Sequence, residues 1–158
     1  MDVSNPLQLQ SSWGHLFQGA AADDGILTIE KRLWVVCMNY GEIDDTWVDH
    51  DNVSGLTVVA INDASTAVLP DQQVFAQTEM AISWLSRGYP VLGHCGAGVS
   101  RASYHNLPVI MHVKQIGYDG ALALLRTVRP QAQPNNGFEA HLRRLEPWLT
   151  ASVLPNGQ

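Results

Sequence analysis

Residues 91–101 read Val-Leu-Gly-His-Cys-Gly-Ala-Gly-Val-Ser-Arg, and this stretch decides the fold of the chain. An apolar run rich in strand-forming residues leads to Gly93, where we expect regular strand pairing to end. A glycine-containing loop follows Cys95, and a long segment with the apolar spacing of a helix begins at Arg101. The order strand, loop, helix predicts an anion-binding loop of about the size of a phosphate group.

The residues between Cys95 and Arg101 are suited to hold an oxyanion. Glycines allow successive backbone N–H groups to point inward, and the helix N-terminus adds unpaired N–H donors and partial positive charge. Arg101 stands six residues after Cys95, so its planar guanidinium can close the loop with two parallel hydrogen bonds. A thiol among such donors ionises easily, and a thiolate beside a bound phosphate is a nucleophile directed at phosphorus. The predicted phosphate-binding residues are Gly96, Ala97, Gly98, Val99, Ser100 and Arg101.

The motif from His94 to Arg101 resembles the HC-x5-R signature of the cysteine-based protein tyrosine phosphatases, and its interior, Ala-Gly-Val-Ser, is most similar to the dual-specificity branch. The structural alternative is a buried cysteine beside an ordinary strand-to-helix turn. The resemblance covers about residues 56–148 and fades in the first third of the chain. Two positions depart from the family: Ala102 stands where Ser or Thr is usual, and Tyr104-His105 is bulkier and more polar than usual.

Length and composition indicate one globular domain. The chain has 158 residues, 46% of them apolar and 15% charged, which suffices for a buried core. We expect a single domain over residues 1–158, with a polar arm at 1–12 and a frayed tail at 151–158. The net charge of −6 does not favour nucleic acid or an anionic membrane as a partner, and no apolar run reaches membrane-span length. The sequence indicates no oligomeric state.

The two cysteines give no disulfide framework and suit a reducing compartment, so we predict a cytoplasmic protein. The N-terminus lacks the basic and apolar regions of a signal peptide. Cys37 lies in a predicted strand and is interpreted as a packed core thiol. The alternative is a resolving cysteine that forms a reversible disulfide with Cys95.

Residues 41–52 form the most acidic stretch of the chain. We interpret them as an exposed loop with Trp47 folded inward. No spacing matches a known set of metal ligands, so we predict no metal site and no cofactor. The carboxylates and the histidine of this loop are Glu42, Asp44, Asp45, Asp49, His50 and Asp51.

The hydrophobic pattern predicts an α/β fold with a central, mostly parallel sheet of about four or five strands flanked by helices. We expect residues 33–38 to form a central strand and residues 56–61 a buried one. Pro108 falls inside a predicted helix and should kink it. The predicted strands are 13–17, 26–29, 33–38, 56–61 and 89–92, and the predicted helices are 71–87, 102–116, 121–128 and 134–150.

Asp63 is the candidate general acid. It follows predicted strand 56–61, and open α/β sheets place their sites at the carboxyl ends of strands. In the dual-specificity family a general-acid Asp stands at a similar place, also just after a strand. A simple turn or helix-cap Asp is the alternative. Asp71 is the rival carboxylate, but Pro70-Asp71 is more typical of a helix start.

The resemblance implies two displacements at phosphorus that need no cofactor. Cys95 attacks a phosphate monoester held by the loop amides and Arg101, while Asp63 protonates the leaving group. Water then attacks the cysteinyl-phosphate with Asp63 as the base, and the Ser100 hydroxyl stabilises the leaving thiolate. We expect His94 to orient the loop and the thiolate rather than to shuttle protons.

The segment after residue 128 also resembles the dual-specificity family, in which it tethers the last helices. It contains Arg129-Pro130 and then Pro-Asn-Asn-Gly-Phe at 134–138. We interpret Arg129 and Asn135 as structural supports of the signature loop.

Three functions remain open. The first is a dual-specificity phosphatase acting on phosphotyrosine and phosphoserine/threonine of a protein or peptide. The second is the same chemistry on a phosphoinositide, a nucleotide or an RNA 5′ phosphate. Those branches tend to have a basic residue within the loop, whereas Gly96, Ala97 and Val99 are neutral. The third is a phosphate-binding module without turnover, against which the intact Cys95, Arg101 and Asp63 argue.

Overall fold

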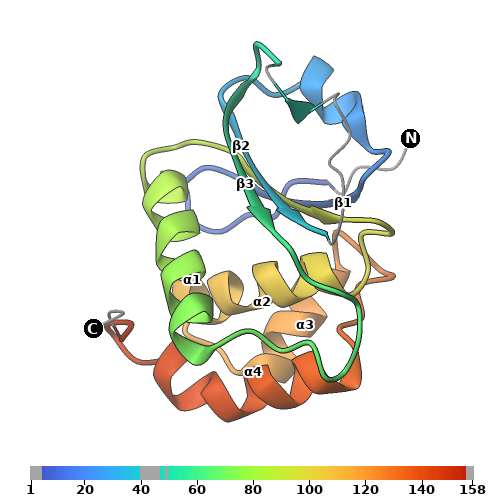
Figure 1. Cartoon of the computed structure of the whole chain (residues 1–158). Helices are drawn as coiled ribbons and strands as arrows, with labels where there is room; N and C mark the ends of the chain where they lie inside the picture. The colour runs from blue at the N-terminus through green and yellow to red at the C-terminus, as the bar shows by residue number, and fades with distance from the viewer. Residues whose placement is uncertain (1–4, 40–46, 49, 156–158) are drawn as a thin grey trace.

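Four parallel strands form one sheet in the spatial order β1-β4-β2-β3 (Figure 1). This computed structural model of the protein describes residues 5–39, 47–48 and 50–155. The strands are β1 (Leu16–Ala20), β2 (Leu33–Met38), β3 (Val53–Val59) and β4 (Val91–Cys95). The helices are the 3-10 helix η1 (Asp24–Thr28), α1 (Asp71–Ser86), α2 (Arg101–Lys114), α3 (Tyr118–Arg126) and α4 (Asn136–Leu149). The predicted α/β class is therefore confirmed.

The two central strands, β4 and β2, are nearly free of solvent exposure. Every residue of β4 is buried, and in β2 only Trp34 is partly exposed. Their near-continuous apolar sequences suit parallel strands that are covered on both faces. The prediction of a central strand at residues 33–38 is confirmed.

The predictions about strands β3 and β4 are each wrong in one respect. The predicted buried strand 56–61 corresponds to β3, which lies at the edge of the sheet, where a neighbour covers only one side, and Val58 is 44% exposed. Pairing in β4 does not end at Gly93 but continues to Cys95, which pairs with Ala20. The reason is that β1 runs alongside β4 and supplies it with backbone partners.

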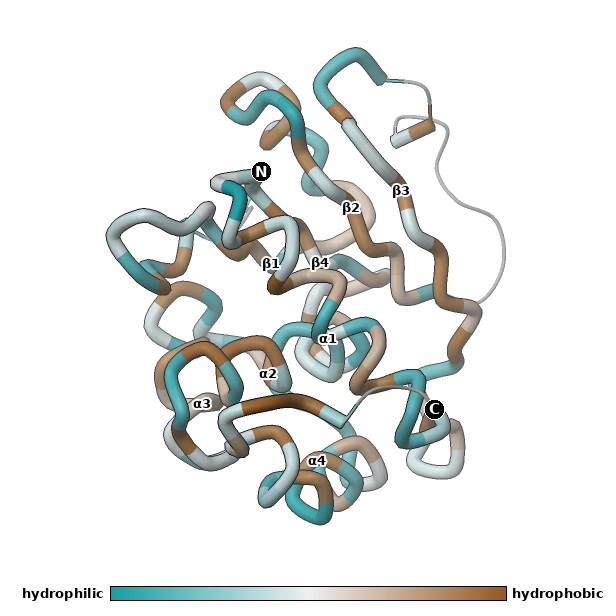
Figure 2. Tube along the Cα trace, turned by 90° about the vertical axis from the view of Figure 1, so that its left-hand side faces the viewer, coloured by the Kyte–Doolittle hydropathy of each residue, from teal (hydrophilic) through white to brown (hydrophobic). Residues whose placement is uncertain are grey.

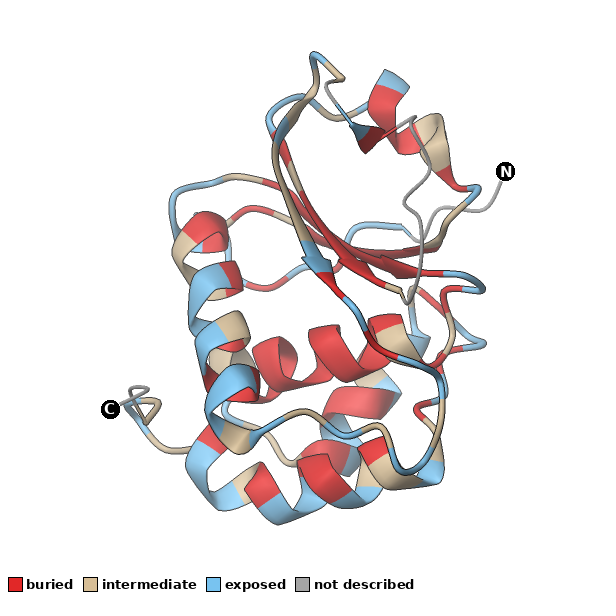
Figure 3. Cartoon of the chain, in the orientation of Figure 1, coloured by how far each residue is buried: buried red, intermediate tan, exposed pale blue. Residues whose placement is uncertain are grey.

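The α-helices lie on one face of the sheet, and α2 is the central one (Figure 1). It packs against β1, β2 and β4 and also contacts α1, α3 and α4. Residues 102–111 of α2 are all buried, so the helix is red over most of its length in Figure 3. Pro108 lies within α2, and the helix continues beyond it to Lys114.

The opposite face of the sheet is covered by η1 and by Trp47, which is fully buried against Phe17, Leu33 and Leu92. Trp47 is folded inward as predicted. The strand predicted at residues 26–29 is instead the 3-10 helix η1. A single helical turn buries Ile26 and Leu27 against the sheet without a strand partner.

The remaining segments follow the hydrophobic pattern. Leu7 and Leu9 are buried, and Leu7 forms a bridge to Leu16, so the described part of the predicted N-terminal arm lies against the sheet. Hydrophobic residues run along β2 and β3, whereas the turn before β3 is hydrophilic (Figure 2). Glu42, Asp44, Asp45 and Asp49 of the acidic loop lie outside the described residues.

Candidate active site

The signature stretch lies where β4 passes into α2. Cys95 is the last residue of β4 and is 2% exposed, and Arg101 is the first residue of α2. The backbone N–H of Ala102 donates to the sulfur of Cys95 at 3.4 Å. The N-terminus of α2 therefore faces the sulfur, and its unpaired N–H groups stabilise negative charge there.

The segment between α3 and α4 holds three carbonyl groups of the loop. Arg129 donates from Nε to Gly98 O at 3.1 Å and from Nη2 to Ala97 O at 3.2 Å. The N–H of Gln133 donates to Val99 O at 3.0 Å. In a trans peptide the C=O and the following N–H point in opposite directions. The N–H groups that follow these carbonyls therefore point away from their partners and are available to an oxyanion.

Arg129 is fixed in turn by a buried ion pair. Its side chain is almost inaccessible to solvent, and its Nη1 lies 3.6 Å from Asp23 Oδ2. Gly98 has a φ of 69°, and a Cβ there would lie 2.5 Å from Arg129 Nη2. Glycine is therefore required at this position both for its left-handed backbone and for the close approach of Arg129.

A buried polar network supports the loop from the side of the sheet. Gln18, on β1, donates from Nε2 to Gly98 O at 3.1 Å and to Ser103 Oγ at 2.8 Å. The Ser103 hydroxyl donates to Val99 O. Ser103 thus gives the loop a hydroxyl contact one residue after Ala102, where the family usually has its own hydroxyl.

Asn106, on α2, completes this network. Its Nδ2 donates to Gln18 Oε1 at 3.2 Å and to Phe17 O at 3.0 Å, and its Oδ1 lies 2.8 Å from His105 Nδ1. Burial lowers the pKa of His105, so its ring stays neutral at neutral pH and donates from Nδ1 to Asn106. The network adds no charge beneath the loop.

Arg101 reaches two segments that follow neighbouring strands. Its Nη1 donates to Asn39 Oδ1 at 2.8 Å, just after β2, and to Ile61 O at 3.2 Å, just after β3. A Cβ at Gly96 would lie 3.2 Å from Arg101 Nη2, so the guanidinium lies against the loop. Parallel strands end at the same edge of the sheet, which is why these segments meet at the loop.

Asp63 lies in the segment between β3 and α1, residues 60–70, which we call the acid segment. Its side chain is exposed, and its Oδ1 accepts from Asn135 Nδ2 at 2.9 Å. The Asn135 backbone N–H donates to Ser100 Oγ at 2.9 Å, and its Oδ1 caps α4 by accepting from Phe138 N. Asn135 therefore joins Asp63 to Ser100 at the end of the signature loop.

Asp71 is held elsewhere. It begins α1, as predicted, but its carboxylate binds α4, accepting from Arg144 at 2.7 and 3.1 Å and lying 2.7 Å from His141 Nε2. The hydrogen bond from Arg144, followed by that from His141, lowers the pKa of Asp71 to about 2. The Asp71 carboxylate is therefore held in its ionised form by α4, whereas Asp63 is linked to the signature loop through Asn135.

His94 and Cys37 lie on the face of the sheet opposite the α-helices. His94 stacks on Trp47 with 4.9 Å between ring centroids, and Cys37 is its partner in the register of β2 and β4. Cys95, by contrast, packs with the helix-facing core. Both cysteines are free thiols, and burial raises the pKa of Cys37. A direct Cys37–Cys95 disulfide would require a thiol to cross the sheet.

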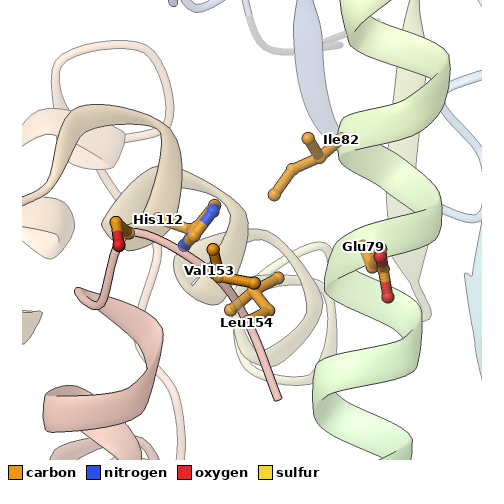
Figure 4. A pocket seen from close by; sticks show the side chains of 6 residues that line it. Glu79, Ile82, His112, Val153 and Leu154 are labelled. Atoms are coloured by element: carbon orange, nitrogen blue, oxygen red, sulfur yellow. The ribbon is translucent and has the colours of Figure 1, made fainter. Parts of the chain in front are cut away.

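Two further observations concern other kinds of site. Within the part of the chain that the structure describes, no group of three or more His, Cys, Asp or Glu side chains could hold a metal ion. A separate pocket lies between α1, α2 and the C-terminal segment (Figure 4). Its His112 is about 16 Å along α2 from Arg101, so this pocket is not the phosphate loop. Its lining residues are Glu79, Ile82, His112, Ser152, Val153 and Leu154.

Sequence reasoning missed several residues around the loop, above all Gln18, Asn39 and Asn106. Each is an amide side chain: Gln18 contacts the loop and Asn39 contacts Arg101 from distant parts of the chain, and Asn106 reaches the loop through Gln18. A buried amide must have hydrogen-bond partners, so a Gln within the short strand β1 was a usable signal. The sequence alone could not predict which residues would be the hydrogen-bond partners of Gln18, because they lie far away along the chain.

Comparison with known proteins gives the family. The chain matches the dual specificity phosphatase catalytic domain over residues 28–147, which begins earlier than the predicted resemblance. The chain therefore belongs to this family, an assignment that supports phosphatase activity. It is 35% identical over 81 residues to dual specificity protein phosphatase 12 of Mus musculus, which covers 49% of this chain and 24% of that protein. The match spans only about a quarter of that relative.

Solved structures share the fold. A mouse putative dual specificity phosphatase complexed with zinc tungstate has a TM-score of 0.69 and 23% identity, covering 95% of this chain and 92% of that one. PTPMT1 in complex with PI(5)P has a TM-score of 0.67 and 16% identity, covering 85% and 92%. No helix among the described residues is long and apolar enough to cross a membrane.

Proposed function

We propose that this protein is a dual-specificity protein phosphatase that works through a cysteinyl-phosphate. One observation supports this most strongly. The Cys95 sulfur faces the start of α2, and the loop beside it has its carbonyls turned outward and its amides available to an oxyanion. Such a loop suits a trigonal-bipyramidal phosphoryl group, whose equatorial oxygens gather negative charge. The tungstate found with the mouse relative is a tetrahedral oxyanion, as is a phosphate monoester before it reacts.

The first step transfers the phosphoryl group to the enzyme. The Cys95 thiolate forms a bond to phosphorus, and the bond from phosphorus to the ester oxygen breaks. Arg101 and the loop amides stabilise the equatorial oxygens, and Asp63 gives its proton to the departing oxygen. Arg101 Nη1 already donates to Ile61 O at the start of the acid segment, so its guanidinium lies between the loop and that segment.

The second step returns the enzyme to its starting state. Asp63, now ionised, takes a proton from water as the water oxygen attacks phosphorus, and the sulfur leaves as a thiolate. The Ser100 hydroxyl accepts from Asn135, which leaves its own proton to stabilise the departing sulfur. No cofactor takes part in either step.

Three residues have supporting roles. Asn135 holds both the general acid and Ser100, so it sets the distance between them. Arg129 holds the loop carbonyls. His94 is 1% exposed and packed on Trp47, so it supports the strand end that presents Cys95 rather than moving protons.

The substrate class follows from the charge of the loop. Gly96 and Ala97 are exposed and neutral, and Arg101 is the cation within the motif. A loop of this charge suits a single phosphate monoester on a peptide. A phosphoinositide is the second candidate, because a structural neighbour was solved with PI(5)P. A thiolate nucleophile must stay reduced, so the proposed location is the cytoplasm, and a phosphorylated protein is the proposed partner.

The test is phosphate release from a panel of phosphotyrosine and phosphoserine/threonine peptides, phosphoinositides and nucleotides. We expect both classes of phosphopeptide to be hydrolysed faster than the other substrates. Cys95→Ser should abolish turnover and keep vanadate binding, because a hydroxyl fits the loop but is a poor nucleophile. Faster phosphate release from phosphoinositides than from phosphopeptides would contradict a protein substrate and indicate a lipid substrate. Residual turnover of Cys95→Ser above about a tenth of wild type would reject the covalent mechanism.

A further inference from the structure

The acid segment is attached to the signature region at three places. Near its start, Ile61 O accepts from Arg101. In its middle, Asp63 binds Asn135, and Ser65 O touches the backbone of Gly137, where a Cβ would lie only 1.8 Å away. These contacts determine where the Asp63 carboxylate lies relative to the loop.

The third attachment is at the far end of the segment. The backbone N–H of Leu69 donates to the hydroxyl of Tyr104 at 3.1 Å. Tyr104 is three residues after Arg101 on α2, so both side chains lie on the same side of the helix. The helix that begins with the phosphate clamp therefore holds both ends of the acid segment.

The Tyr104 hydroxyl is itself held in one orientation. It lies 2.6 Å from His141 Nδ1, and His141 Nε2 lies 2.7 Å from Asp71 Oδ1. An ionised Asp71 can only accept, so His141 donates to it from Nε2, and in the neutral ring Nδ1 then accepts the Tyr104 proton. The oxygen of Tyr104 is then left to accept from Leu69. Asp71 Oδ1, which also accepts from Arg144 Nη2, ends this chain of hydrogen bonds.

The aromatic ring of Tyr104 is also held in place, by packing. Tyr104 is 2% exposed and is stacked on Phe138 with 4.1 Å between centroids and 4° between planes. Burial raises the pKa of Tyr104 to about 12, so its hydroxyl keeps its proton. Tyr104 is also one of the positions where this chain departs from the residues usual in its family.

We propose that Tyr104 is a positioning residue for the general acid: it fixes the acid segment to α2 through Leu69 and thereby places Asp63 over the leaving group. This inference rests on the role of Asp63 in the proposed function. Tyr104 does not touch the substrate, so its removal should affect the proton-transfer step and leave phosphate binding unchanged. A small displacement of a catalytic group is enough to slow catalysis strongly.

The test uses Tyr104→Phe, which keeps the ring and its stack on Phe138. We expect kcat on a phosphotyrosine peptide to fall about 10- to 100-fold, with KM and vanadate inhibition changed less than about twofold. On an activated aryl phosphate, whose phenoxide leaves without a proton, kcat should fall less than about threefold. Amide exchange at Leu69 should become at least about tenfold faster, because its hydrogen-bond partner is gone.

Tyr118→Phe is the matched control. Tyr118 is also fully buried, but its hydroxyl has no hydrogen-bond partner among the described residues, and it lies on α3, away from the acid segment. Removing that hydroxyl should leave kcat on both substrates unchanged. A loss in both variants would show that deleting any buried tyrosine hydroxyl harms the fold, and it would overturn the specific role of Tyr104.

A double-mutant comparison separates this inference from the proposed function. In an Asp63→Asn background Tyr104→Phe should change kcat less than about twofold, because the group that it positions is absent. If Asp63→Asn itself shows no leaving-group-dependent loss, the general acid is misassigned and both claims fall. If Asp63→Asn shows that loss, the Tyr104 role alone is rejected by either of two results. One is wild-type rates for Tyr104→Phe, and the other is an equal loss on both substrates.

Discussion

At the scale of the residue, Arg101 is a side chain of the motif that connects the phosphate loop to the rest of the site. Its guanidinium lies against Gly96 and bonds Asn39 and the carbonyl of Ile61, so it links the phosphate loop to the ends of two strands. A planar fork can bind two phosphate oxygens while it keeps such a contact, whereas an ammonium is a point charge on a flexible stem. We therefore expect the planar shape of the guanidinium, and not its charge alone, to be required for phosphate binding.

Arg101→Lys tests this distinction. We expect kcat/KM on a phosphotyrosine peptide to fall about 10²- to 10³-fold, the usual cost of losing a placed donor to a developing oxyanion. Vanadate should also bind more weakly. Steady-state kinetics and vanadate inhibition measure both effects. A fall in activity of less than about threefold would mean that Arg101 is not the clamp.

At the scale of the element, the signature loop depends on supports that lie outside it. Gly98 is the tightest point, because Arg129, Gly19 and Ala20 all approach it within 2.7 Å of where a Cβ would stand. Its positive φ adds the strain that any other L-residue would have there. The loop therefore cannot accept a side chain at this position without moving its supports.

Gly98→Ala is expected to lower the free energy of unfolding by more than about 2 kcal/mol and to reduce turnover strongly. Gly88→Ala is the matched control, because Gly88 also has a positive φ of 86° but would place its Cβ in open space. It should cost only the backbone strain, about 1 kcal/mol, and leave rates unchanged. Urea unfolding of both variants measures the difference. Equal destabilisation would show that the close approach of Arg129 is unimportant.

The contact between α1 and α4 depends on pH. Asp71 has a pKa of about 2 in the folded protein, below its ordinary value of 3.8, chiefly because Arg144 donates to it. A lowered carboxyl pKa stabilises the fold above about pH 4, and this stabilisation is lost as pH falls toward 2. The side chain of Asp71 is 42% exposed, so solvent screening limits the effect to about 1 kcal/mol or less.

Asp71→Asn should therefore be less stable than wild type at pH 7, and the difference should shrink by more than half between pH 4 and pH 2. Asn keeps an acceptor for His141, so the variant removes mainly the charge. Denaturant unfolding of the two proteins across this range gives the comparison. A difference that is the same at pH 7 and pH 2 would contradict the ion pair with Arg144.

At the scale of the whole molecule, much of the fold was predictable from local pattern. The strand-loop-helix order around Cys95 needed only the apolar run, the glycines and the helical spacing that follows. The central strand at residues 33–38 was correct to the residue because an unbroken apolar run of that length is typical of a buried parallel strand. The helix starting at Asp71 was marked by the preceding proline.

The errors have a common physical cause, which is that neighbours in space are not neighbours in sequence. The strand 56–61 is as apolar as a central strand, yet β3 lies at the sheet edge because β1 and β2 take both sides of β4. Residues 26–29 have strand-forming side chains but no strand to pair with. The contacts of Gln18 with Gly98 and of Tyr104 with Leu69 span 80 and 35 residues, so no spacing rule could supply them.

The central claim is that the phosphoryl group passes through Cys95, and trapping that intermediate tests it most directly. Ser100→Ala should slow the breakdown of the cysteinyl-phosphate more than its formation, so this intermediate should accumulate. Ser100→Ala would be mixed with a radiolabelled phosphotyrosine peptide and quenched in acid within the first turnover. The account predicts label on Cys95 approaching one phosphate per chain, a matching burst of dephosphorylated peptide, and no label in Cys95→Ser. Continued turnover with no label on Cys95 would contradict it.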